Sequence, residues 1–143
     1  MKIGFLTDKN GYRAPIHPES IEKYSLDVHL EKDIFEYLKY SESIQNNVKT
    51  ISKVSDLDIV ACVENIEDKK IKDLKEGAIL IGIFDFEKIE DIKNLRPDIK
   101  ILSFFKLPRI SRAQNLDALS SQANLLGYAS VLRAAKETSD VVP

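Results

Sequence analysis

The residues best suited to binding chemistry lie together in one polar segment, residues 108–122. Within it stand two arginines, Arg109 and Arg112, followed by Gln114 and Asp117. A guanidinium can donate hydrogen bonds to phosphate or carboxamide oxygens, and Gln or Asp can hold a neutral polar substituent of a ring. The polar segment is therefore predicted to be a ligand-binding loop.

The position of the polar segment supports this interpretation. It follows an apolar run at 99–105 that predicts a buried strand, and it leads into a helical pattern that extends to about Lys136. Open α/β sheets bind their ligands at the carboxyl ends of strands, where such loops begin. The upstream chain is accordingly predicted to be a scaffold that presents this loop.

Local capping is an alternative explanation for the same side chains. Ser111 and Gln114 have the spacing of a capping box, and Asn115 or Asp117 can cap the helix that follows. Residue types alone favour helix caps over ligand contacts, although both interpretations stay open.

The helical pattern after the polar segment predicts two packed sides. Leu116, Leu119, Ala123 and Leu126 recur at helical spacing, which predicts one side facing a core. The pattern is also rich in small residues, including Gly127, which costs a helix roughly 1 kcal/mol relative to alanine. Small residues allow a close approach either to the sheet or to a partner helix, and the second explanation leads us to expect a homodimer.

Composition limits the possible functions. The chain has 143 residues, 43% hydrophobic and 31% charged, with a net charge of −2, which predicts a single globular domain over 1–143 and no nucleic-acid partner. Its one cysteine and two histidines predict neither a disulfide nor a metal site. We find no signal peptide and no membrane segment, so the expected location is the cytoplasm.

Strand and helix patterns alternate along the scaffold, which predicts an α/β fold: a three-layer parallel sheet of Rossmann-like or flavodoxin-like type. The expected strands are residues 3–6, 26–30, 59–63, 78–84 and 99–105, with a weaker one at 48–51. The expected helices are residues 18–24, 34–38, 69–75 and 86–95.

Five scaffold side chains carry individual predictions. Arg13, beyond the first strand, is either an anion-binding residue or a surface arginine. His17 is expected to cap or pack at a helix start, and His29 to face solvent. Cys62 is expected to be a small core residue, whereas Asp85 either faces a ligand or caps the next helix. The sequence leaves any further role of Cys62 and Asp85 open.

The polar segment resembles a known family. Residues 108–114 (PRISRAQ), Asp117, residues 120–124 (SSQAN) and Gly127-Tyr128 are similar to the mobile-loop motif of proton-translocating NAD(P) transhydrogenases. That motif belongs to the N-terminal half of their NAD-side (alpha) subunit, a half shared with alanine dehydrogenases. The resemblance is dense over 109–132 and extends to residues 1–31, where Arg13 and Pro18-Glu19 match, and to 80–82.

The resemblance implies a role in hydride transfer between NAD(H) and NADP(H), with the loop folded over the nicotinamide. By motif position, Gln114 and Asp117 are the implied catalytic residues, with Gln114 reaching the gap between the two rings. Arg109 and Asp117 are implied to hold the nicotinamide carboxamide, and Ser120 joins the same polar set. Arg13 is expected to be a further cofactor-binding residue.

Other features of the family are missing from this sequence. Its five glycines form no G-x-G-x-x-G motif, so we expect contact with the nicotinamide end of NAD only and no NAD-binding Rossmann domain. The implied partners are that Rossmann domain or subunit and an NADP(H)-binding component, at the periphery of a membrane complex. The isolated chain is not expected to be a competent enzyme.

Two other functions remain as alternatives. One is a non-catalytic interaction or dimerisation module of the same fold. The other is a fragment of an alanine-dehydrogenase-like oxidoreductase, which the resemblance disfavours because Cys62 and Asp85 stand where that enzyme needs lysine and histidine.

Overall fold

The structure, a computed structural model, describes residues 1–8, 13–23, 27–34, 48–108, 110–111, 113 and 117–137. The chain divides into two compact units, Met1–Ser103 and Phe104–Pro143, and each is described by itself. The prediction of one domain stays a prediction.

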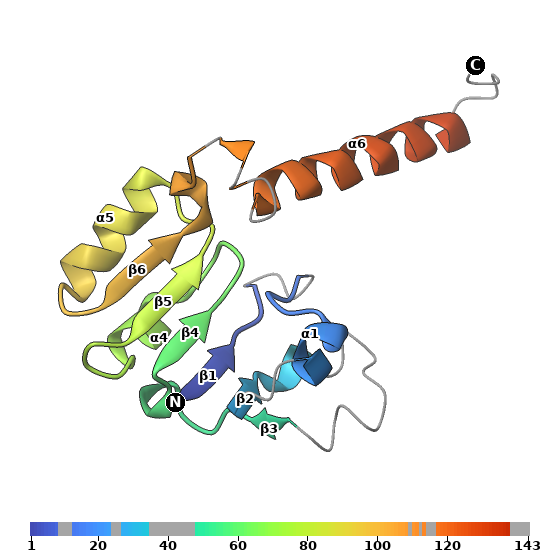
Figure 1. Cartoon of the computed structure of the whole chain (residues 1–143). Helices are drawn as coiled ribbons and strands as arrows, with labels where there is room; N and C mark the ends of the chain where they lie inside the picture. The colour runs from blue at the N-terminus through green and yellow to red at the C-terminus, as the bar shows by residue number, and fades with distance from the viewer. Residues whose placement is uncertain are drawn as a thin grey trace. The chain divides into compact units, whose positions relative to one another are not determined.

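The first unit is built on a sheet of six parallel strands in the described residues (Figure 1). The strands are β1 (Lys2–Phe5), β2 (Asp27–Leu30), β3 (Lys49–Thr50), β4 (Ile59–Ala61), β5 (Ile79–Gly82) and β6 (Lys100–Ser103). Their order, β3-β2-β1-β4-β5-β6, is that of Rossmann dinucleotide-binding sheets rather than the flavodoxin order. The predicted α/β parallel-sheet fold is confirmed.

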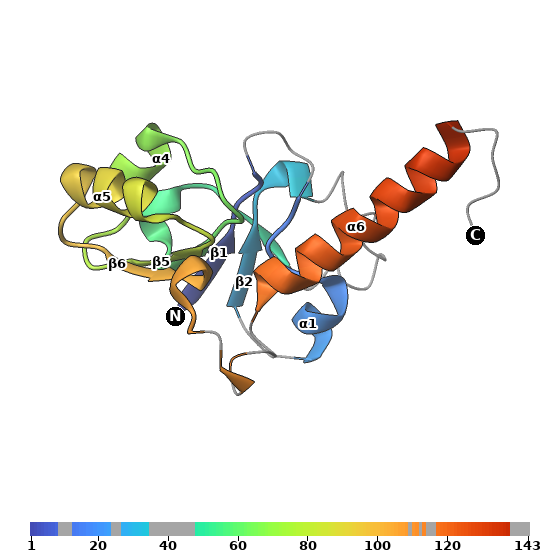
Figure 2. The ribbon, with the colours of Figure 1, turned by 90° about the horizontal axis from the view of Figure 1, so that it is seen from above.

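The helices of this unit cover both faces of the sheet. They are α1 (Pro18–Lys23), α4 (Asp68–Lys72) and α5 (Phe86–Leu95), with a 3-10 turn, η1 (Val54–Asp56). The chain moves outward from β1 to β2 in one direction and from β4 to β6 in the other. Right-handed crossovers in opposite directions place α1 on one face and α4 with α5 on the other, as Figure 2 shows.

Two apolar clusters match these two faces. On one face Val60 and Leu80 pack with Ile71 of α4 and with Ile89 and Ile92 of α5. On the other, the strand residues Val28 and Leu30 pack with Ile21 of α1, together with Ile34 and Val48. A parallel sheet buried on both faces explains why its central strands are nearly continuous apolar runs in the sequence.

The two histidine predictions have different outcomes, and the prediction for His29 is wrong. The His29 side chain is only 13% exposed, and its Nε2 lies 3.3 Å from Asp27 Oδ1. His17 holds the cap position of α1, because its backbone carbonyl accepts the Ser20 N–H, whereas its side chain is 70% exposed and does not pack.

Two other scaffold predictions are confirmed. Cys62 is buried in the core, and burial raises the pKa of its thiol to about 12. Asp85 caps α5, because its carboxylate accepts the Lys88 N–H at 2.8 Å. Capping of α5 is therefore sufficient to explain the position of Asp85, and no ligand contact is needed.

The second unit begins with a 3-10 turn, η2 (Phe104–Lys106), followed by the polar segment and the helix α6 (Ala118–Glu137). The last predicted strand therefore ends early, because Phe104 and Phe105 belong to η2. Ala123 and Leu126, which we expected to face a core, are exposed, whereas Leu116 lies outside the described residues. None of the helices that the structure describes combines the length and apolar content of a membrane span.

Candidate functional site

The described end of the polar segment is organised around Asp117 at the start of α6. One carboxylate oxygen of Asp117 accepts the Ser120 backbone N–H at 3.0 Å, and the other accepts the Ser120 hydroxyl at 2.6 Å. This geometry satisfies an N–H at the helix start that has no partner within the helix. The capping interpretation of Asp117 is confirmed.

Capping and ligand binding are compatible at Asp117. An ionised carboxylate offers about four acceptor positions, so bonds to Ser120 do not use up its capacity. Asp117 and Ser120 together present an acceptor and a hydroxyl within one turn of the helix. A carboxamide, which carries both N–H donors and a carbonyl acceptor, is chemically suited to this pair.

The other predicted residues of the polar segment lie outside the described residues. These are Arg109, Arg112, Gln114 and Asn115. Their roles, including the proposed capping box from Ser111 to Gln114, stay predictions.

Arg13 lies at the point where the strand order of the sheet reverses, between the carboxyl ends of β1 and β4. Its Nη2 donates to Asp8 Oδ2 and to Glu64 Oε2, both at 2.8 Å, and its Nη1 donates to Glu64 Oε1 at 3.1 Å. Asp8 follows β1 and is almost fully buried, whereas Glu64 follows β4 and is partly exposed. The guanidinium thus connects the two strands on either side of the crevice.

These contacts change the electrostatics of Arg13. The hydrogen bond to Glu64 raises the pKa of the guanidinium further above its usual range, against burial, with a further contribution from Asp8. Two protein carboxylates oppose its single positive charge, so the group is not an uncompensated cation waiting for an anion. Arg13 as a cofactor-binding residue stays a prediction.

A small cavity of about 120 Å³ lies beside this cluster, at the carboxyl ends of β1, β2 and β4. Glu31, which follows β2, accepts the Thr7 N–H at 2.9 Å, the Thr7 hydroxyl at 2.8 Å and the Lys70 ammonium at 2.5 Å. Burial by itself would raise the pKa of Glu31, but the bonds from Lys70 and Thr7 outweigh it and lower that pKa. Glu31 is therefore held as a carboxylate at neutral pH.

This crevice does not fit the pyrophosphate of a dinucleotide. Rossmann domains bind pyrophosphate at the reversal point through a glycine-rich turn and a helix N-terminus. Here Asp8, Glu31 and Glu64 lie at that point, where Arg13 and Lys70 balance them only in part, so the excess negative charge of the described residues disfavours phosphate. Despite the Rossmann strand order, a nicotinamide nucleotide bound to this unit would need its phosphates elsewhere.

Sequence reasoning missed Asp8, Glu31, Glu64 and Lys70. Asp8, Glu31 and Glu64 each follow a predicted parallel strand within two residues, and that position was the available signal. Lys70 lies in the helix predicted at 69–75, where position gave no such signal. Charge type gave no further clue, because surface carboxylates and lysines are common throughout the chain. Over the described ranges, no three side chains of His, Cys, Asp or Glu gather as a possible metal-binding group.

Comparison with known proteins gives consistent relatives. The NAD(P) transhydrogenase subunit alpha of Haemophilus influenzae is 35% identical over 139 residues, which is 90% of this chain and 27% of that protein. An NAD(P) transhydrogenase subunit alpha protein of Rickettsia prowazekii is 33% identical over an alignment of 160 residues, covering 100% of this chain and 42% of that protein. The chain thus spans less than half of each relative. No protein-family model matches it.

Solved structures agree with these relatives. The transhydrogenase of Sinorhizobium meliloti superposes with a TM-score of 0.84 and 25% identity, over 100% of this chain and 46% of that one. An L-alanine dehydrogenase superposes with a TM-score of 0.60 and 14% identity, over 78% of this chain and 35% of that one, which shows a shared fold alone.

Proposed function

Because this chain corresponds to the N-terminal domain of the NAD(P) transhydrogenase alpha subunit, we propose that it supplies the loop that covers the nicotinamide during hydride transfer between NAD(H) and NADP(H). The observation that carries the proposal is 33–35% identity to alpha subunits over 90–100% of the chain.

The chemistry of hydride transfer suits the residues of the polar segment. The bound nucleotides supply the hydride donor and acceptor, and no proton needs to move. The protein therefore contributes ring positioning and exclusion of water. A carboxylate, an amide and a guanidinium can hold a carboxamide without acid–base catalysis.

The proposed roles follow from this requirement. Asp117 accepts a carboxamide N–H while it caps α6, and Ser120 adds its hydroxyl to the same group. Arg109 donates to the carboxamide oxygen, and Gln114 reaches the gap between the two rings. Arg13 acts indirectly, by holding the ends of β1 and β4 together, and its direct contact with a cofactor is the weaker part of the proposal.

The proposed partners supply the pyrophosphate binding that the described crevice does not provide. Its carboxylates disfavour pyrophosphate, which supports binding of the nucleotide's remaining part by a separate Rossmann domain or subunit. An NADP(H)-binding component completes the reaction. We place the assembly on the cytoplasmic side, peripheral to a membrane complex, with the chain as a homodimer.

Hydride transfer tests the proposal directly. In a complex reconstituted with the NAD-binding and NADP(H)-binding partners, we expect Gln114→Ala and Asp117→Ala each to lower the transfer rate by about 100-fold, the cost of misplacing reacting groups by about 1 Å. The rate is measured with NADH and an NADP⁺ analogue.

A matched control separates capping from ligand positioning. Asp85→Ala removes the cap of α5 as Asp117→Ala removes the cap of α6, but Asp85 lies outside the polar segment. We expect Asp85→Ala to leave the transfer rate within about twofold of the original, since lost caps act on stability. Normal transfer by both polar-segment variants would contradict the proposal.

Exposed apolar residues on α6 favour a second candidate, an interaction or dimerisation module. Residues 118–132 carry no charge, and five large apolar side chains of the helix are 55–70% exposed. These are Leu125, Leu126, Tyr128, Val131 and Leu132. A helix that is apolar on most sides is normally covered by protein.

Sedimentation tests this candidate. A Cβ placed on Gly127 meets no atom within 4 Å in the described residues outside its own helix backbone, so a side chain there has open space at its base. If α6 pairs with its copy near Gly127, the larger side chain is expected to weaken the dimer by about tenfold or more, the order of effect of overpacking. An unchanged sedimentation profile would exclude the contact at Gly127.

A further inference from the structure

Ser103 lies at the boundary between the sheet and the chain that leads to the polar segment. It is the last residue of β6 and of the first unit, directly before η2 and the polar segment. The contacts of Ser103 therefore determine where the chain leaves β6 on its way to the polar segment.

The ladder between β5 and β6 stops at this residue. Backbone pairing runs from Ile79 opposite Lys100 to Gly82 opposite Ser103. On the side of β5 that faces β4, backbone pairing continues one residue beyond β5, because the Ile83 N–H donates to the Val63 carbonyl at 2.7 Å. Towards β6 no further backbone rung forms in the described residues, since the chain turns into η2.

The Ser103 side chain supplies the missing rung. Its Oγ accepts the Phe84 N–H at 2.9 Å and donates to the Phe84 carbonyl at 2.6 Å. Phe84 is 1% exposed, so its backbone groups would have little access to water without this serine. One hydroxyl therefore satisfies both backbone groups of Phe84 and allows β6 to end at Ser103, two residues before its predicted end.

We propose that Ser103 is a positioning residue for the chain that leads into the polar segment, because its two hydrogen bonds to Phe84 hold the end of β6. The functional importance of this positioning rests on the proposed function, whereas the two hydrogen bonds to Phe84 do not depend on it. Alanine at this position would free the start of the segment, whereas threonine would keep the hydroxyl.

Limited proteolysis tests the positioning in the full chain. Lys106 is exposed and lies three residues after Ser103. We expect Ser103→Ala to speed tryptic cleavage after Lys106 by about tenfold. The chain around Lys106 must open locally before trypsin can cut it, and without the two hydrogen bonds to Phe84 this opening costs less free energy. Cleavage after Lys93 in α5 should change little, and Ser103→Thr should restore the original rate after Lys106.

Nucleotide binding provides a readout that a purely structural role would not affect. NADH is titrated while the NMR signals of the Asp117 and Ser120 backbone amides are followed. The NADH concentration that gives half of the maximal shift should rise about tenfold in Ser103→Ala and return to the original value in Ser103→Thr. A control, Ser52→Ala, changes an exposed serine outside the sheet and should have no effect.

Three outcomes would overturn the inference: unchanged cleavage, equal acceleration after Lys93 and Lys106, or no rescue by threonine. If the original chain shows no NADH-dependent shift even in the complex reconstituted with the NAD-binding partner, the proposed function fails at that step. The cleavage comparison would still decide whether Ser103 holds the segment, so the two failures are distinguishable.

Discussion

Replacing Arg96 with alanine is expected to lower the free energy of unfolding by about 3 kcal/mol, because the change leaves several backbone carbonyls without their charged donor. Arg96 follows α5, and its side chain is only 17% exposed. Urea unfolding of the purified chain, followed by circular dichroism, measures the change.

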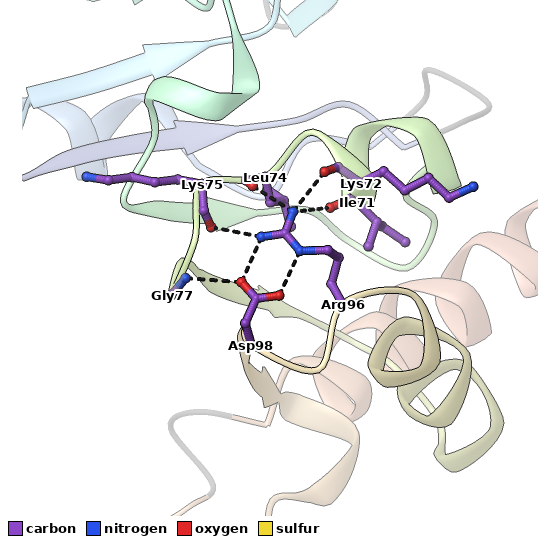
Figure 3. A network of polar contacts seen from close by, with 7 residues as sticks. All are labelled: Ile71, Lys72, Leu74, Lys75, Gly77, Arg96 and Asp98. Atoms are coloured by element: carbon purple, nitrogen blue, oxygen red, sulfur yellow. Dashed lines mark hydrogen bonds and ion pairs between the residues drawn. The ribbon is translucent and has the colours of Figure 1, made fainter.

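The expected effect rests on how many groups one guanidinium serves (Figure 3). Nη1 donates to the Leu74 carbonyl at 2.7 Å and to the Lys72 carbonyl at 2.8 Å, both at the end of α4. Longer bonds of 3.4 Å reach the carbonyls of Ile71 and Lys75. Helix ends leave such carbonyls without partners, and a positive charge there also favours the helix dipole.

Asp98 holds the guanidinium in place. Its two carboxylate oxygens each accept a bond of 2.7 Å from Arg96, and one of them also accepts the Gly77 N–H at 3.3 Å. The forked contact is specific to arginine, because lysine offers a single ammonium. We therefore expect Arg96→Lys to recover less than half of the stability lost in Arg96→Ala, while Lys93→Ala, an exposed change in α5, stays within about 0.5 kcal/mol.

The pH dependence of unfolding provides an independent check on the same contact. The hydrogen bonds from Arg96 hold the pKa of Asp98 well below its ordinary value of 3.8. A carboxyl with a lowered folded-state pKa contributes stability above its unfolded pKa and loses it as the pH falls through the folded value. Arg96→Ala should therefore flatten the loss of stability below about pH 4. A curve with unchanged steepness would show that Asp98 does not depend on Arg96.

Much of the fold was predictable because its signals are local. The apolar run of β5 and the periodicity of α5 each lie within one element, and both elements formed where the sequence indicated. Asp85 and Asp117 were readable as possible caps for the same reason, since a cap and the N–H groups it accepts are three residues apart.

The unpredicted contacts depend on residues far apart in the chain. Arg13 binds Glu64 from 51 positions away, and Arg96 reaches the end of α4 across more than twenty residues. Only the order of strands brings these pairs together, and sequence periodicity does not specify that order. The early end of β6 was missed for a related reason, because Phe104 and Phe105 are apolar enough to continue a strand while the Ser103 hydroxyl replaces its next rung.

Gly82→Ala is expected to destabilise the first unit by about 2 kcal/mol through overpacking of the core. A Cβ at Gly82, on β5, would lie 2.5 Å and 2.8 Å from two ring atoms of Phe84 and 3.0 Å from the Cys62 carbonyl oxygen. The ring is 1% exposed and has no free space to move into, and the carbonyl belongs to the backbone next to β4. Thermal unfolding and urea unfolding should both report the loss.

A double-mutant cycle identifies the ring as the cause. Phe84→Leu alone should cost about 1 kcal/mol or more through lost packing, but it removes the atoms that the new methyl group meets. We therefore expect the double variant Gly82→Ala/Phe84→Leu to be more stable than the sum of the single changes by about 1 kcal/mol. Gly127→Ala is the control, since a Cβ there meets no described atom and should not destabilise the chain. Strict additivity at Gly82 and Phe84 would show that the Cys62 carbonyl, rather than the ring, excludes a side chain from this position.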